Sequence, residues 1–441
     1  MFGCGSDDPP PAQQPPPACS VLDQTGCAAG QVCEETAAGT GCFAPVHIKG
    51  HVFDAMTTSP IAGARVVLRD ANESVVSKVA VTAADGTYDI SAPAKRDANG
   101  KPISANVTLR ADAQGYLGFP KPPRVALPVD VSTAQGDPLT IASTATDIAL
   151  IPLQNATGTG WISGTVKAPH PGGTLIVAGG STGVADADGA YEVFNVAAGA
   201  ATVRGYGAGL QLAEASATVE AGKETPNVDL TQTGEATAVV SGNVQIVNAP
   251  GGSSTSVVLA VEETFQESVI RGEVPKGLRA ANVSGAFSIA GVPSGRYVVL
   301  AAFENDGLVR DPDTSIGGTE IVHITVAAAS MALSQGFKVT GALAVNSPGA
   351  NGPEEVSGTP TFSWEDDSSE DTYTLQVFDA FGNEVWKQEG IVGPKGSKPV
   401  TAPYAGPALT PAMYYQFRAT SIKDGTPISS TEDLKGVFVY R

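Results

Sequence analysis

The stretch DGAYEVFNVAAGAATV (Asp188–Val203) recurs as SGAFSIAGVPSGRYVV (Ser284–Val299), and this repeat is the strongest indication of fold in the sequence. Five positions match without a gap at a constant spacing of 96 residues: Gly189, Tyr191, Val193, Val196 and Gly199 correspond to Gly285, Phe287, Ile289, Val292 and Gly295. Side chains alternate in character along each copy, which predicts paired β-strands with glycine turns. A repeat of this length predicts a tandem array of similar modules.

A third copy opens as ADGTYDISAPA, with Gly86, Tyr88 and Ile90 in the same places. Upstream of each copy lies a short strand with a central glycine: IKGHV from Ile48, ISGTV from Ile162 and VSGNV from Val240. The predicted turn glycines are Gly86, Gly189, Gly199, Gly285 and Gly295. We expect Gly295 to adopt a positive φ, because it matches Gly199 at the hairpin.

These residues resemble the carboxypeptidase regulatory-like domain, which is a transthyretin-type sandwich. The first copy matches best, through Gly50, PIAGARVVL (Pro60–Leu68) and TAADGTY (Thr82–Tyr88). It departs where KRDANGKPIS (Lys95–Ser104) separates the hairpin strands, and the later copies have blurred P-h-x-G-A segments. The resemblance covers about residues 46–346. It implies three sandwiches over 46–157, 158–235 and 236–346, and it specifies fold better than function.

The last hundred residues differ from the repeats. Phe362, Trp364, Tyr373, Leu375, Val377 and Trp386 alternate there, and PAMYYQFRAT follows from Pro411. Residues 347–441 resemble a fibronectin type III or immunoglobulin-like module, and the missing cysteine pair favours the fibronectin type. The aromatic side chains are expected to be core residues rather than a ligand platform. The predicted fold class is therefore all-β, with tandem small sandwiches.

All five cysteines lie in the first 42 residues. Cys19, Cys27, Cys33 and Cys42 predict two disulfides in an oxidising compartment, with the connectivity open among three pairings. A zinc site is disfavoured, because no close C-x-x-C pair exists. This segment, 18–45, resembles small knotted repeats that precede β-domains in myxobacterial-type surface lipoproteins.

Cys4 follows a small residue and precedes a polar, Pro-rich stretch. This resembles the end of a bacterial lipoprotein signal, which implies that Cys4 carries lipid and anchors the chain in the outer membrane. The charged and apolar parts of such a signal are expected upstream, since three residues precede Cys4. A free or mispaired cysteine is the alternative. Residues 1–17 then form a polyproline tether.

Composition and motifs argue against several function classes. The net charge of −19 disfavours nucleic-acid binding. The chain lacks G-x-S-x-G, H-E-x-x-H and phosphate-loop motifs, so we predict no catalytic residues, no cofactor and no metal. Along a strand, His47 and His51 are about 13 Å apart, too far to chelate one ion. His170 and His323 are interpreted as ordinary surface or core residues.

Two acidic stretches are candidates for ligand sites. Asp186 and Asp188 resemble part of a calcium loop, but a turn fits better because further carboxylates are missing. The run Glu365, Asp366, Asp367, Glu370 and Asp371 is interpreted as a solvated loop tip. Neither stretch therefore predicts a cation site.

Two function classes remain. The first is a non-enzymatic cell-surface lipoprotein with a structural or adhesive role. The second is a carbohydrate-binding accessory lipoprotein, which exposed aromatic pairs would favour. The partner is an unidentified extracellular protein or glycan. The small, polar joins near 156–160, 233–236 and 347–352 further predict modules that unfold independently.

Overall fold

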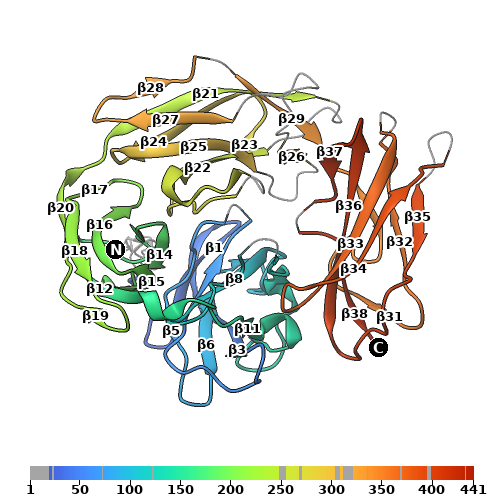
Figure 1. The fold of residues 1–441 in the computed structure, drawn as a ribbon, viewed down its shortest axis with the longest axis horizontal. Coiled ribbons are helices and arrows are strands. Elements are labelled where there is room, and N and C mark those ends of the chain that lie inside the picture. The colour runs from blue at the N-terminus through green and yellow to red at the C-terminus, as the bar shows by residue number, and fades with distance from the viewer. Residues whose placement is uncertain are drawn as a thin grey trace, which may run out of the picture.

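The computed structural model describes residues 19–441 except 22–23, 72, 122–123, 248–254, 268–270, 303–307, 311–320, 335, 368–369, 395–398 and 433. Within these residues the regular structure is β-strand with four short 3₁₀ turns, and no α-helix occurs (Figure 1). The predicted all-β fold class of tandem sandwiches is confirmed. No segment of this described part forms a helix long and apolar enough to cross a bilayer.

Sandwich 1 consists of two sheets that enclose one core. In the outer sheet, β3 pairs with β6, β10 and β11; in the inner sheet the order is β5-β4-β8-β9. The strands are β3 (Val46–Asp54), β4 (Arg65–Arg69), β5 (Ala80–Val81), β6 (Thr87–Ala92), β8 (Asn106–Asp112), β9 (Val129–Asp130), β10 (Thr140–Ile141) and β11 (Ile148–Leu150).

Sandwich 2 repeats this plan. Its outer sheet has the order β15-β12-β20-β17 with β19 on β12, and its inner sheet has the order β14-β13-β16-β18. The strands are β12 (Thr159–Lys167), β13 (Leu175–Ala178), β14 (Ser181–Val184), β15 (Ala190–Ala197), β16 (Gly199–Tyr206), β17 (Leu210–Leu212), β18 (Ala215–Val219), β19 (Glu224–Thr225) and β20 (Leu230–Glu235).

Sandwich 3 has the same order, with an outer sheet β24-β21-β29-β26 carrying β28 on β21 and an inner sheet β23-β22-β25-β27. The strands are β21 (Ala238–Val247), β22 (Thr255–Val261), β23 (Arg279–Val283), β24 (Ala286–Val292), β25 (Gly295–Ala302), β26 (Leu308–Arg310), β27 (Val322–Val326), β28 (Met331–Ala332) and β29 (Phe337–Gly341). The repeated sequence thus forms β15–β16 and β24–β25. The predicted pairing of the two strands in each copy was wrong, because β15 and β24 lie in the outer sheets and β16 and β25 lie in the inner sheets.

The C-terminal sandwich pairs a small sheet, β30-β32-β35, with a larger one, β31-β38-β36-β33-β34 plus β37 on β36. The strands are β30 (Val345–Ser347), β31 (Glu354–Val356), β32 (Thr361–Trp364), β33 (Thr372–Asp379), β34 (Glu384–Ile391), β35 (Val400–Pro403), β36 (Tyr414–Lys423), β37 (Thr426–Ser430) and β38 (Val437–Tyr440). Phe362, Trp364 and Tyr373 are buried in its core, whereas Trp386 is half-buried.

The cysteine-rich segment folds as a hairpin of β1 (Val32–Thr36) and β2 (Gly39–Phe43). The short strand β7 (Lys95–Arg96) of sandwich 1 pairs with β1 in parallel. β7 begins the insertion KRDANGKPIS, the place where the first copy departs from the repeat pattern. The insertion therefore docks the hairpin onto sandwich 1.

Neighbouring modules pack directly against one another (Figure 1). Leu175, Val177 and Tyr206 of sandwich 2 belong to the same core cluster as sandwich 3. Val184 of sandwich 2 packs on Val67 and Val75 of sandwich 1. The prediction that the modules unfold independently therefore has to be tested against these shared apolar clusters.

Three strands of the inner sheets, β4, β13 and β22, are buried on both faces. All four residues of β13 and all seven of β22 are buried, as are the last four of β4. A strand with one wet face alternates apolar and polar residues, whereas a strand covered on both faces has a continuous apolar run. The runs in β4, β13 and β22 are of the second kind, and this signal in the sequence was missed.

Candidate functional site

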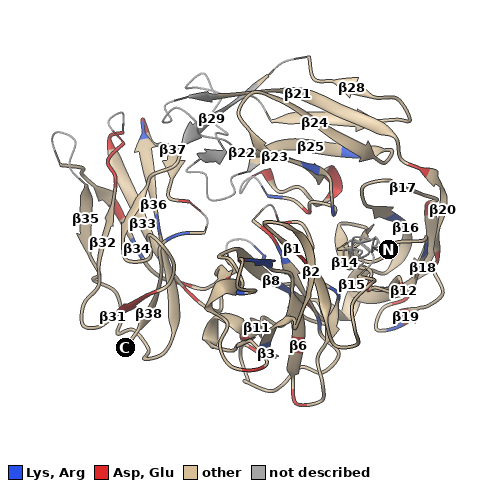
Figure 2. Cartoon of the chain, turned by 180° about the vertical axis from the view of Figure 1, so that it is seen from behind, with Lys and Arg blue, Asp and Glu red and all other residues tan. Residues whose placement is uncertain are grey.

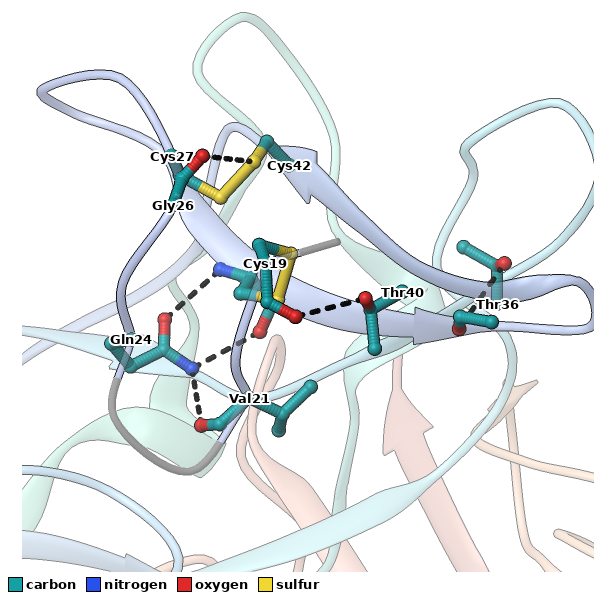
Figure 3. Close-up of a disulfide and its surroundings, with 10 residues drawn as sticks. Cys19, Val21, Gln24, Gly26, Cys27, Thr36, Thr40 and Cys42 are labelled. Carbon is teal, nitrogen blue, oxygen red and sulfur yellow. Dashed lines mark hydrogen bonds between the residues drawn. A yellow bond between two sulfur atoms is a disulfide. The ribbon is translucent and has the colours of Figure 1, made fainter. Parts of the chain in front are cut away.

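The predicted disulfide-rich segment contains two bonds, Cys19–Cys33 and Cys27–Cys42 (Figure 3). The first bond is buried and the second lies nearer the surface. Of the three pairings left open, the structure thus has the one that joins alternate cysteines. Cys4 and the Pro-rich stretch lie outside the described residues.

The hairpin is fixed to sandwich 1 by a buried ion pair between Glu34 and Arg96. Glu34 also accepts a hydrogen bond from Ala94 N at 3.0 Å. The Arg96 guanidinium donates to Ala44 O at 2.9 Å and lies 5.1 Å from the centre of the Phe43 ring. Paired buried charges of this kind fix orientation, because either charge left alone would be costly.

The predicted turn glycines divide into two groups. Gly86, Gly189 and Gly199 have φ of 78°, 87° and 128°, a region that side chains disfavour. Gly285 and Gly295 are outside that region, so the positive φ expected for Gly295 was wrong. A Cβ on Gly295 would instead lie 2.9 Å from the Tyr206 ring of sandwich 2. Position 295 has little room for a side chain because Tyr206 of the neighbouring module packs against it.

Ion pairs join sandwiches 1 and 3 at the centre of the molecule. Glu273, which follows β22, accepts hydrogen bonds from Arg69 of β4 at 2.5 Å and Arg110 of β8 at 2.7 Å. Arg110 also contacts Asp112 at 2.6 Å and donates to Thr182 Oγ1 of sandwich 2 at 2.6 Å. Figure 2 shows basic segments on β8 and charged segments on the facing loops of sandwich 3. Three sandwiches thus meet around Arg110.

Two further pairs flank this junction. Asp70 pairs with Arg279, and Glu73 pairs with Arg271. Burial alone would raise the pKa of Glu273, but the charges of Arg110 and Arg69 outweigh burial and hold that pKa below its usual value. Asp112 and Glu273 likewise raise the pKa of Arg110, against the opposing effect of burial. In this junction acidic side chains of one module pair with arginines of another. Because the pairs connect neighbouring modules, we assign the network a structural role.

A second type of contact is repeated between successive sandwiches. A β-bulge places Asn195 of β15 and Gly291 of β24 at φ of 57° and 71°, at equivalent positions of the repeat. Each bulge meets a glycine turn of the preceding sandwich: Asn195 Oδ1 accepts from Gly115 N, and Gly291 O accepts from Gly209 N, both at 2.8 Å. We call these two contacts the joints.

The histidines and acidic stretches have local partners. His47 and His51 lie on the outward face of β3 and contact Asp89 and Asp147, respectively, at 2.7 and 3.2 Å. His323 contacts Glu262 at 2.8 Å.

Asp186 accepts hydrogen bonds from Asp188 N and Ala190 N, which closes a turn as expected. The acidic run of the C-terminal sandwich is more than a solvated tip, because Tyr373 donates to Asp366 and Ser421 to Asp367.

No protein-family model matches the chain, and no curated protein matches it. Similar solved structures include a DUF3823 family protein from Bacteroides ovatus, which is 13% identical with a TM-score of 0.21 and covers 46% of this chain and 98% of its own. The major pilin subunit of Bacillus cereus is 10% identical with a TM-score of 0.17, over 67% of this chain and 98% of its own.

Two B repeat units of the collagen binding protein of Staphylococcus aureus are 11% identical with a TM-score of 0.16. They cover 89% of this chain and 98% of their own. At these scores the likenesses carry no inference about function.

Proposed function

We propose that this chain is a non-enzymatic structural or adhesive protein of the bacterial cell surface, held in the outer membrane by lipid on Cys4. Its modules are bounded at residues 46, 158, 236 and 347. The ion-pair junction around Arg110 carries the proposal, because it and the joints hold modules in fixed orientations. A rigid multi-module body suits a spacer that presents surfaces away from a membrane.

The disulfides support an extracytoplasmic location, because such bonds persist in oxidising compartments. The Pro-rich residues after Cys4 fit a tether of about 3 Å per residue between the membrane and the hairpin. The ion pairs of Glu273, Asp70 and Glu73 connect sandwich 1 with sandwich 3, which fits an architectural role. A glycan-binding platform gains no support, since every described aromatic side chain is buried or half-buried.

Expression of the gene with its upstream region in a Gram-negative host tests the anchor. Mass spectrometry should find Cys4 as a lipid-modified N-terminal residue, and the Cys4→Ser variant should move from the membrane fraction to the soluble fraction. An unmodified peptide that contains Cys4 would contradict the anchor. A pull-down from native cell surfaces, with the Cys4→Ser protein as bait, would identify the partner. Turnover of any substrate by the pure protein would contradict the non-enzymatic role.

A further inference from the structure

The chain contains two Asn-Gly pairs, Asn99–Gly100 and Asn351–Gly352. In such a pair the main-chain nitrogen of the glycine can attack the side-chain amide carbon of the asparagine, because the glycine has no Cβ to hinder the approach. Asn99 and Asn351 are both exposed, so water can reach both side chains. Exposure therefore does not distinguish the two pairs, which differ in how the backbone around each of them is held.

The first pair lies in a closed turn of the insertion in sandwich 1. Gly100 N donates to Asp97 O at 3.0 Å, and Asp97 Oδ1 accepts from Asn99 N at 2.8 Å. Neighbouring residues pack on the same turn: the Arg96 guanidinium donates to Gly100 O at 3.3 Å, and a Cβ on Gly100 would lie 3.3 Å from the Phe43 ring. The glycine nitrogen cannot turn toward the Asn99 side chain unless these hydrogen bonds break.

The second pair lies in the join between sandwich 3 and the C-terminal sandwich. The chain is held on both sides of it, because Gly349 O accepts from Gly436 N at 3.1 Å and β31 pairs in parallel with β38. Between these anchors, residues 350–352 bend the chain without a turn hydrogen bond. No residue in the described part of the chain accepts from Gly352 N, and nothing lies within 4 Å of a Cβ on Gly352. The glycine nitrogen can therefore approach the Asn351 side chain without breaking a hydrogen bond.

We propose that the fold selects Asn351 as a site of spontaneous deamidation, which replaces its neutral amide by a carboxylate. The Gly352 nitrogen loses its proton to hydroxide and forms a bond to Cγ of Asn351. The bond between Cγ and the side-chain nitrogen then breaks, and that nitrogen takes up a proton and leaves as ammonia. Water opens the resulting succinimide at either carbonyl, which gives aspartate or isoaspartate at position 351. The whole conversion consumes a water molecule and releases ammonia, so it needs no oxidant, reductant or enzyme.

The conversion changes the join between the two modules. Position 351 lies three residues before Glu354, and β31 begins with the acidic residues Glu354 and Glu355. The new carboxylate therefore adds a negative charge where like charges already gather, and isoaspartate also adds a carbon atom to the main chain. Anion-exchange chromatography should separate the modified protein from the unmodified one, because the two differ in net charge.

The two Asn-Gly pairs test the proposal within one protein. The folded full chain is incubated at mildly alkaline pH in water labelled with heavy oxygen, and peptide mass spectrometry follows the labelled carboxyl group at positions 351 and 99. Conversion of Asn351 should be at least about tenfold faster, because the closed turn must lose several hydrogen bonds before Asn99 can react. In urea, where both segments are unfolded, the two rates should become similar.

The variant Asn351→Gln is the matched control, since attack on its longer side chain must close a larger ring and should be slow. This variant should not develop the change in anion-exchange elution that the unaltered chain develops over the same time. Conversion of Asn351 that is no faster than that of Asn99 in the folded chain would overturn the proposal. A rate difference that persists in urea would also overturn it, because flanking sequence rather than the fold would then set the rates.

Discussion

At the scale of single residues, the opening strands of sandwiches 1 and 2, β3 and β12, each have a glycine near the centre for a steric reason. A Cβ on Gly50 or Gly164 would lie 2.0 Å from a backbone carbonyl, that of Thr146 or Val228. The same carbonyls accept hydrogen bonds from Tyr88 and Tyr191, the aromatic residues of the repeat. Burial, the largest effect, raises the pKa of both tyrosines. The glycine makes room for a crossing chain, and the tyrosine holds that chain there.

We expect Gly164→Ala to destabilise sandwich 2 by about 3 kcal/mol or more, because backbone rather than a flexible side chain must move. Gly234→Ala is the matched control in the same module, since nothing lies within 4 Å of its added Cβ. Its effect should stay within about 0.5 kcal/mol. Urea unfolding measures both free energies. Similar values for the two variants would show that the Val228 carbonyl does not exclude a side chain at position 164.

At the scale of elements, the joints connect turns to bulges. In the first joint, Asn195 Nδ2 donates to Ala113 O and Tyr116 O at 3.1 and 2.8 Å, in addition to the bond that Oδ1 accepts. Asn tolerates the positive φ of a bulge better than most residues. The second joint uses Gly291, which has no side chain, and brings the backbones closer. Equivalent positions of two repeats therefore bind the preceding sandwich in two ways, through an Asn side chain in the first joint and through the backbone in the second.

Two substitutions at Asn195 separate backbone strain from side-chain bonding. Asn195→Gly keeps the positive φ and loses the amide bonds, so it should cost about 1–3 kcal/mol. Asn195→Ala adds strain to that loss and should cost about 1 kcal/mol more. Free energies of unfolding from urea titrations give both values. Equal stability of the wild type and the glycine variant would mean that the amide bonds contribute nothing to the joint.

Substitution of Gly295 tests its contact with Tyr206, which the structure has in place of the expected positive φ. Tyr206 and Tyr297 meet edge to face beside it, with centroids 5.9 Å apart. Gly295→Ala should destabilise the protein by about 1–3 kcal/mol through overpacking. Most of this cost should disappear in a Tyr206→Ala background, as a double-mutant cycle measures. Gly199→Ala is the comparison: its cost comes from a φ of 128° with open space around the Cβ, so it should not depend on Tyr206.

At the scale of the whole molecule, sandwich 2, sandwich 3 and the C-terminal sandwich form an arc around sandwich 1 (Figure 1). Besides its contacts with sandwiches 2 and 3, sandwich 1 touches the C-terminal sandwich through Arg124, which donates to Phe381 O at 2.9 Å, and through the rings of Phe53 and Phe381. β26 and β29 of sandwich 3 lie against β37. Contacts between modules therefore join residues distant in sequence.

The junction should make stability depend on pH. The folded pKa of Glu273 lies below its usual value of about 4.5, so its stabilising effect is present above that value and lost as pH falls through the folded pKa. Asp112 contacts the same Arg110, whereas Asp70 and Glu73 pair with Arg279 and Arg271 beside the junction. Glu273→Gln should cost about 2–4 kcal/mol at pH 7 and much less at pH 3.

Urea unfolding at the two pH values measures this difference. Glu355→Gln is the control, because that carboxylate forms an exposed pair with Arg441 and should matter little at either pH. A pH-independent effect of Glu273→Gln would show that the ionised carboxylate does not stabilise the junction.

Packing between modules also changes the expected unfolding. Sandwiches 1, 2 and 3 share buried apolar clusters, so they should unfold in one transition rather than module by module. Limited proteolysis should leave the joins near 156–160 and 233–236 uncut until that transition. Early cleavage at either join, with separate calorimetric transitions for the sandwiches, would show that the modules unfold independently. That is the behaviour that the small, polar joins indicate.

Much of the local structure follows from short stretches of sequence. Alternation along Asp188–Val203 and Ser284–Val299 predicts the strands β15, β16, β24 and β25, and the first copy predicts β6, because strand periodicity depends on neighbouring residues. The clustered cysteines predict a disulfide-rich segment for the same reason. The pairing of the two strands of a copy as a hairpin was predicted wrongly, because which sheet a strand joins depends on the packing of the whole sandwich. Gly86 and Gly189 lie in turns with positive φ as predicted, since these φ values follow from local turn geometry, and Gly199 has a positive φ at the first residue of β16.

Tertiary structure alone decided the disulfide pairing, the role of Gly295 and the charged junction. Arg69 and Glu273 are about two hundred residues apart, and no local pattern records that they meet. The continuous apolar runs of β4, β13 and β22 indicate burial on both faces, yet they do not say which module covers the second face. Spacing encodes which way a side chain points along its own strand, whereas its partner across an interface depends on how whole sheets pack.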